Sequence, residues 1–294
     1  SDIEVVTLDR QNPDEPPIAS LIEDRDWLPA ASVVYRLTSS QNLRFSASQT
    51  VNRPEFRELA PFRFKPIAGG LEQTGNPDLV SASIQSLDAR WEWFPSSGDV
   101  IAVSLFHKDF ENPIEAVQVS GAALTETYQN AISARNQGVE LEFRRHLGAW
   151  ADVLDPFTLI LNYSYIDSRI ELGSNTIQTN LDRPLVGQPD HVGNVVLEWL
   201  HPSSSSMVRL LYNFTGEKIE FAGTNGLEDI VQQPLGTIDL VYRQGFRLVG
   251  IDWTAKLSGE NLTNEQVEWT QGGEPWRGWN PGRKIGVSLG LNFF

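Results

Sequence analysis

The sequence predicts an all-β protein, a transmembrane antiparallel up-and-down β-barrel. Apolar and polar residues alternate in about twelve segments, which places the two kinds of side chain on opposite faces of a strand. The connections between these segments are alternately short and long, as in barrels whose two rims lie on opposite sides of a bilayer. Several polar faces carry charges that would be costly in the dry core of a β-sandwich, so a water-filled interior is favoured.

The composition narrows the alternatives. The 294-residue chain has a net charge of -15, which argues against a nucleic-acid partner because phosphate binding needs clustered Lys and Arg. It has no cysteine, which excludes disulfides, thiolate catalysis and zinc–thiolate sites. No apolar run is long enough for a transmembrane helix. The start, SDIEVVTLD, is not an export signal, so we expect a fragment of an exported protein.

The first six strands are predicted from alternation between turn-forming segments. Residues 3–7 alternate, and the Pro-rich, acidic residues 11–26 are expected to form a loop. Residues 87–93, LDARWEW, form the clearest internal strand, with three charges on one face. The other strands expected here are residues 27–37, 43–50, 101–105 and 139–143, separated by the short turns TSSQ and PSSG and by the long connections 52–80 and 112–134, the latter with a small hairpin through 114–119.

The last six strands follow the same pattern. In residues 285–293 the large apolar side chains share one face, and Phe294 lies one residue beyond the outward row that ends at Phe293. Residues 2–9 and 285–293 are expected to be open edges. The other strands expected are residues 157–165, 195–199, 208–214, 238–242 and 249–257, with turns at 148–156, HPSSSS and RQGF and long connections at 168–189, 216–233 and 262–282.

A series of short motifs runs through the chain: RPEFREL at 53–59, GNPDL at 75–79, KDFENPI at 108–114, NQGVELE at 136–142, NYSY at 162–165, RPL at 183–185, QP at 188–189, NLTN at 261–264 and PGR at 281–283. In this order they resemble the C-terminal barrel half of TonB-dependent receptors. The resemblance implies a 22-stranded barrel filled by an N-terminal plug. Residues 1–294 would then form about the last 12 strands, without the plug, the TonB box and the first strands.

The resemblance also implies a function. Such a receptor lies in the outer membrane of a Gram-negative bacterium and actively takes up a scarce nutrient such as a siderophore, a vitamin or an oligosaccharide. The implied partners are outer-membrane lipid, the plug with the remaining strands, TonB acting through the plug, and a small-molecule or oligosaccharide ligand. No enzymatic activity and no cofactor are expected. With the C-terminus on the periplasmic side, the long loops would lie outside the cell.

Candidate ligand-binding residues lie in two of the long connections. Trp269, Trp276 and Trp279 either stack on a sugar ring or an aromatic ligand or pack within their loop. Glu220 is the acidic candidate. The acidic residues around it match no known calcium loop, and the four scattered histidines lack zinc-site spacing, so no metal site is expected.

Charged residues of mixed sign are predicted to face the lumen, where they would pair with one another or with the plug. They are Arg44, Asp88, Arg90, Glu92, Glu140, Glu142, Arg144, Asp239, Asp252 and Lys256. Aromatic residues on the strands are interpreted as interfacial girdles rather than ligand platforms. They are Trp91, Trp93, Tyr163, Tyr165, Trp199 and Trp253.

Two other functions remain open. Twelve strands could close into a stand-alone outer-membrane pore, which would conduct ions without a plug. A barrel-embedded hydrolase would need a nucleophile or base oriented by a partner. His107 and His201 lie near expected strand ends but have no motif neighbour, so no catalytic residue is assigned.

Overall fold

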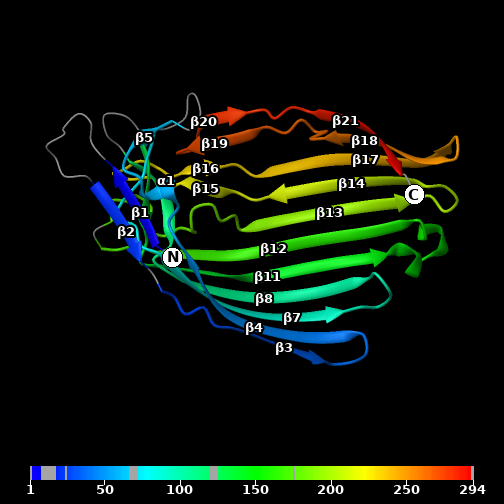
Figure 1. The fold of residues 1–294 in the computed structure, drawn as a ribbon, viewed down its shortest axis with the longest axis horizontal. Coiled ribbons are helices and arrows are strands. Elements are labelled where there is room, and N and C mark those ends of the chain that lie inside the picture. The colour runs from blue at the N-terminus through cyan, green and yellow to red at the C-terminus, as the bar shows by residue number, and fades with distance from the viewer. Residues whose placement is uncertain are drawn as a thin grey trace.

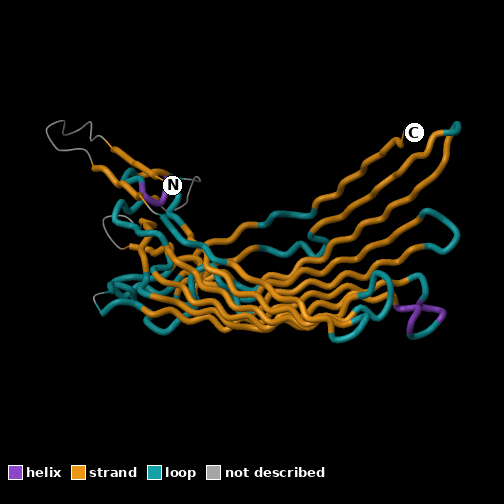
Figure 2. Tube along the Cα trace, turned by 60° about the horizontal axis from the view of Figure 1, so that its bottom comes forward, coloured by secondary structure: helices purple, strands orange, loops and turns teal. Residues whose placement is uncertain are grey.

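The computed structural model describes residues 2–7, 18–23, 25–65, 72–119, 125–174 and 176–292. Among these residues, one antiparallel sheet of eleven strands forms a curved wall in which each strand pairs with the next along the chain (Figures 1 and 2). Its strands are β3 (Ala30–Arg36), β4 (Gln41–Asn52), β7 (Ala82–Trp93), β8 (Val100–Glu111), β11 (Ser133–His146), β12 (Phe157–Glu171), β13 (His191–Leu200), β14 (Ser206–Thr215), β17 (Leu235–Leu248), β18 (Ile251–Glu260) and β21 (Lys284–Asn292). The predicted meander is confirmed. The described wall is open, with β3 and β21 at its edges.

The strand register keeps apolar and polar side chains on separate faces. One row of directly paired positions is entirely leucine: Leu159, Leu197, Leu210 and Leu240. A row three residues along the strands, on the other face, is entirely polar: Glu142, Asn162, Asn194, Asn213 and Thr237. The apolar face is well exposed, with Leu210 at 43% and Val287 at 82%. A wall with an exposed apolar outside and a polar inside fits hydrocarbon on one face and water on the other.

The predicted sorting of connections by length is also confirmed. Five short connections lie at the end of the wall where the C-terminus is marked in Figure 1: residues 37–40, 94–99, 147–156, 201–205 and 249–250. Those at residues 53–81, 112–132, 172–190, 216–234 and 261–283 are long and lie at the opposite end. We call these five long connections the cap. No helix in the described part of the chain is long and apolar enough to span a membrane.

The cap is folded rather than irregular. It contains the helix α1 (Phe56–Leu59) and two four-stranded sheets. One sheet consists of β5 (Arg63–Phe64), β6 (Glu72–Thr74), β10 (Thr125–Asn130) and β9 (Ile114–Val119), and the other of β15 (Lys218–Phe221), β16 (Ile230–Gln232), β19 (Val267–Gln271) and β20 (Glu274–Trp279). The hairpin predicted at residues 114–119 is confirmed, because β9 pairs with β10.

Two predictions about the N-terminal segment are wrong. Residues 3–7 do form β1 (Asp2–Thr7), but this strand pairs with β2 (Ile18–Glu23) in a separate two-stranded sheet, so the wall has eleven strands and β3 is its first edge. Residues 11–26 are not a loop throughout, because the three prolines end at Pro17 and leave the following backbone free to pair. The expected outward row ends at Phe293, which, with Phe294, lies outside the described residues.

The turn predicted at RQGF is also wrong. Residues 243–246 lie within β17, and the hairpin turns at Val249 and Gly250, between the paired Leu248 and Ile251. Both turn residues have positive φ, 51° and 78°. Two-residue hairpin turns need this backbone to match the strand twist, and valine rarely adopts it. From the sequence alone, the Gly-containing RQGF is therefore the better candidate for the turn.

Candidate ligand-binding surface

The three predicted tryptophans meet in one aromatic cluster of the cap. Trp269 on β19 stacks on Trp276 of β20, with ring centroids 5.9 Å apart and an interplanar angle of 14°. Trp279 meets the same ring edge-on at 5.3 Å, and Phe221 of β15 does so at 5.8 Å. Offset stacking and edge-to-face contacts are the favoured geometries of aromatic pairs. The hairpin and its neighbouring strands therefore hold the rings in place around Trp269.

A cation completes this cluster. The guanidinium of Arg277 lies 5.9 Å from the Trp269 ring and 5.7 Å from the Trp279 ring, within cation–π range of both. The indole N–H of Trp269 is buried and donates to no acceptor among the described residues. Trp279 is 42% exposed. The cluster thus offers the exposed ring of Trp279 and a nearby cation to a ligand.

The sequence interpretation missed two members of this cluster. Arg277 has a local signal, because it lies between Trp276 and Trp279 in the same short hairpin. No sequence signal links Phe221 to the tryptophans. It contacts Trp269 only because β15 pairs with β16, and β16 pairs with β19.

Glu220 belongs to a different group from the tryptophans. Its carboxylate lies 2.7 Å from the ammonium of Lys218 on the same strand. Its charge also affects the buried Glu126 of β10. Burial raises the pKa of Glu126 above its usual value, and the negative charge of Glu220 raises it further. A hydrogen bond of 2.6 Å from Gln73 partly lowers this pKa. The structure therefore places Glu220 beside a buried carboxyl and not in the aromatic cluster.

Polar contacts join the separate loops of the cap. The buried Gln118 of β9 donates its N–H to Ala222 O at 2.8 Å, and its side-chain oxygen accepts a hydrogen bond from Gln271 at 2.7 Å. Thr224 donates its hydroxyl to the Gln118 carbonyl. These contacts connect three of the five long loops of the cap.

Four of the ten predicted lumen charges form one network on the inner face. The Glu92 carboxylate lies 2.9 Å from Arg90 and 3.5 Å from Arg44, and Glu142 lies 2.5 Å from Arg90. Arg90 also donates to the Ser104 hydroxyl at 3.1 Å. These four charges neutralise one another on the wall.

The other six predicted lumen charges lie on the same face but outside this network. Asp239 accepts the Asn261 N–H at 2.8 Å, and Asp252 lies 3.3 Å from Arg247. The register places the remaining four on the inner face: Asp88, Glu140, Arg144 and Lys256.

Aromatic side chains occupy the outward rows as interfacial girdles require. Trp91 and Trp93 stack with centroids 6.5 Å apart, and Tyr163 shares a hydrogen bond of 2.7 Å with His191. His107, expected near a strand end, lies inside β8 on this outer face and is 2.9 Å from Asp109. His201 lies in the turn after β13, where it accepts the Ser203 N–H.

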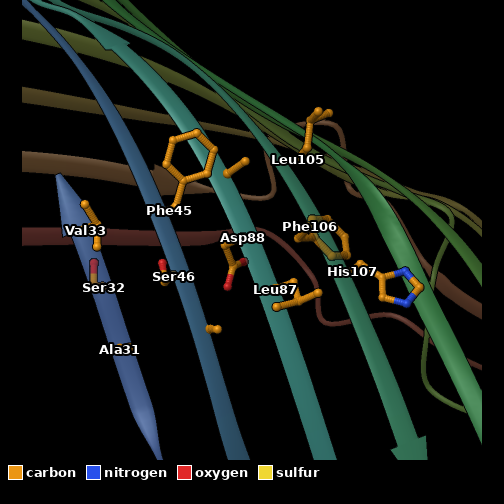
Figure 3. Close-up of a pocket in the computed structure, with 12 residues that line it drawn as sticks. Ala31, Ser32, Val33, Phe45, Ser46, Leu87, Asp88, Leu105, Phe106 and His107 are labelled. Carbon is orange, nitrogen blue, oxygen red and sulfur yellow. The ribbon is translucent and has the colours of Figure 1, made fainter. Parts of the chain in front are cut away.

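A hollow of about 530 Å³ opens on the outer face of β3, β4, β7 and β8 (Figure 3). Its outward-row side chains are mostly apolar, among them Phe45, Leu87 and Leu105, and the small Ala31 and Ala47 leave the space between them. The hollow belongs to the exposed apolar outer face of the wall. The candidate ligand-binding residues lie in the cap instead.

Comparisons with known proteins agree with this architecture. The family model described as TonB dependent receptor-like, beta-barrel, matches residues 6–262. None of the curated proteins compared with the chain matches it.

Several solved structures share the fold. The ferric-catecholate import receptor Fiu from E. coli K12 has 14% identity and a TM-score of 0.63 over 95% of this chain and 36% of its own. The ferric yersiniabactin uptake receptor FyuA from Yersinia pestis has 17% identity and a TM-score of 0.60 over 95% and 39%. The ferric enterobactin receptor PfeA from Pseudomonas aeruginosa, as a mutant, has 18% identity and a TM-score of 0.58 over 90% and 40%.

The chain spans about 40% or less of the length of these receptors. Its eleven-stranded open wall accordingly corresponds to part of their barrels. The family match covers most of the chain, and the wall and the sorted connections agree with it. The chain therefore belongs to the TonB-dependent receptor family, as part of its β-barrel.

Proposed function

We propose that this chain forms wall and external loops of an outer-membrane receptor that actively takes up a scarce nutrient. The exposed outer rows, such as the one through Leu210, would contact lipid, and the inner rows would contact water and a plug. In this scheme residues 1–294 supply the later strands of the barrel. A plug and the remaining strands complete it, and TonB acts through the plug.

The observation that carries this proposal is the folded cap with its aromatic cluster. The Trp269, Trp276 and Trp279 rings offer apolar stacking surface, and Arg277 adds a positive charge. Together they suit a ligand with flat rings or an anionic edge. A siderophore, a vitamin or an oligosaccharide would meet this description. Fiu is named for ferric-catecholate import and FyuA for ferric yersiniabactin uptake.

Binding by the cap does not by itself move a ligand uphill. A bound state must be destabilised by a second event that favours release, because a ligand shifts an equilibrium only through its different affinity for two states. We assign that event to movement of the plug under TonB. The wall and cap then contribute capture and a path, and the energy comes from elsewhere in the receptor.

The test is ligand binding by the complete receptor in detergent. Deleting residues 265–280 is expected to abolish binding, and Trp269→Ala is expected to weaken it about tenfold or more, since one stacked ring contributes roughly 1–3 kcal/mol. Trp150→Ala is the matched control, because Trp150 lies among the short turns at the other end of the wall. Unchanged affinity in the deletion variant would remove the tryptophans from the binding site.

A further inference from the structure

Two cations face each other on the inner wall. Arg243 of β17 and Lys256 of β18 are directly paired positions, and both side chains are exposed on the lumen face. Neither side chain forms an ion pair or a hydrogen bond with a residue in the described ranges. Like charges directly opposite each other on antiparallel strands destabilise the pair. This pair therefore lacks a counter-charge.

Elsewhere in the same sheet, a carboxylate lies beside each pair of opposed cations. Arg44 and Arg90 are also directly opposite, and the Glu92 carboxylate lies between them, 3.5 Å from one and 2.9 Å from the other. On the outer face, Arg169 stands opposite Arg135 and lies 3.8 Å from Asp167. Opposed cations in this sheet are thus accompanied by an acidic group, except at Arg243 and Lys256 within the described residues.

The surroundings of Arg243 supply no free carboxylate. The adjacent strand β18 has two acidic residues, Asp252, which lies 3.3 Å from Arg247, and Glu260, which lies 3.3 Å from Lys284. Glu198 of β13 is paired with Arg209. The position of β21 opposite Lys256 is Ser288. In a chain with a net charge of -15, this end of the inner wall is locally cationic.

A hollow of about 580 Å³ lies next to Arg243. It forms where the β17–β18 hairpin extends past the turn between β13 and β14. Gly245 forms part of it and donates its N–H to Ser205 O at 2.9 Å, so closely that a Cβ would lie 2.6 Å from the Ser205 Cβ. Residues from both faces of the sheet line the hollow: Arg243, Arg247 and Asp252 come from the inner face, and Phe246 and Trp253 from the outer face.

We propose that Arg243 and Lys256, with the hollow beside Arg243, form an anion site that holds a carboxylate against the inner wall at the short-turn end. The carboxylate plays the part that Glu92 plays for Arg44 and Arg90, and charge-assisted hydrogen bonds from both cations hold it. It comes either from an acidic side chain of polypeptide packed in the lumen or from a free small anion. The site is separate from nutrient capture by the cap.

The experiment measures melting temperature in the complete receptor, after each variant is shown to fold by its resistance to SDS before heating. Arg243→Gln and Lys256→Gln are expected to lower the melting temperature, because each removes a contact to the bound carboxylate. About 1 M NaCl should reduce the difference, since screening weakens charge contacts. Arg243→Lys keeps the charge and Arg36→Gln removes a lone cation of the wall, so both should stay near the parent value.

Citrate then separates the two sources. A melting temperature that rises with citrate in the parent receptor, but not in Arg243→Gln, assigns the site to a free carboxylate. Neutralised variants that melt lower without any citrate response assign it to an acidic side chain of the polypeptide. If neutralising either cation leaves the melting temperature unchanged or raises it, and citrate has no effect, the repulsion stands uncompensated and the proposal is overturned.

Discussion

Arg183 and Glu115 form a bidentate ion pair in the interior of the cap. Their two nitrogen–oxygen distances are 3.0 and 2.8 Å, and the side chains are only 1% and 2% exposed. Glu115 also accepts the Val186 N–H at 2.9 Å, and Arg183 donates to Pro184 O and to Gln178. A strand of one long loop is thereby fixed to another loop that lies 68 residues away.

Removing one partner of this pair should loosen the cap. Glu115→Gln leaves the Arg183 charge buried without compensation, which costs about 3–5 kcal/mol. We expect amides in the cap to lose hydrogen-exchange protection while the wall strands keep theirs. The double variant Glu115→Leu with Arg183→Met buries no charge and should recover much of the protection. Equal exchange in Glu115→Gln and the parent would show that the pair does not hold the cap together.

The buried carboxyl of Glu126 predicts a pH dependence of the cap. Burial, assisted by the Glu220 charge, raises its pKa above the ordinary 4.5. The folded cap then binds this proton more tightly than the unfolded chain, so stability falls as pH rises from about the ordinary pKa through the raised one. Ionised Glu126 destabilises the fold at neutral pH.

Glu126→Gln should therefore raise the melting temperature at pH 7, and the gain should vanish below about pH 4, where the carboxyl is protonated in both states. The amide oxygen can still accept the hydrogen bond from Gln73. Glu274→Gln, at the exposed first position of β20, serves as the control and should change little. A gain that is independent of pH would contradict the explanation by ionisation.

Adjacent residues of β14 give a test of which face meets lipid. Leu210 lies in the all-leucine outer row, whereas Leu211 lies on the inner face opposite Asp239. Leu210→Lys should destabilise the folded barrel in lipid by about 2–4 kcal/mol, the cost of a cation at the bilayer midplane. Leu211→Lys should cost far less, because it faces water and a carboxylate. Similar losses in urea unfolding for both variants would refute the assignment of faces.

The hairpin at Val249 offers a stabilising substitution. Valine with φ of 51° is strained, because the left-handed region costs an L-residue roughly 1–2 kcal/mol and favours Asn or Gly. The side chain is 90% exposed and contributes little packing. Val249→Asn should raise the free energy of unfolding by about 1 kcal/mol. Val249→Ile, which keeps the β-branch, should give no gain, and an equal effect of both would show that strain is not the cause.

Much of the candidate site was predictable, but not its geometry. The sequence identifies the three tryptophans as candidate ligand-binding residues because they lie in a long Gly- and Pro-containing connection, where no interfacial girdle is expected. Their meeting around Trp269, with Phe221 and Arg277, depends on the pairing of β16 with β19, whose strands lie far apart in sequence. The buried pair of Arg183 and Glu115 could not be predicted either, because each residue alone resembles a solvated loop charge.

The two faces of the wall, the succession of hairpins and the sorting of their connections can all be predicted from local patterns in the sequence. This information is local, because a residue's face depends only on its position in its own strand, and each wall strand pairs with the next. The tertiary structure decided which loops fold together, where β1 pairs, which lumen charges are neutralised and which are left opposed. These depend on contacts between distant segments, and one strand's alternation carries no information about the strand that lies across from it.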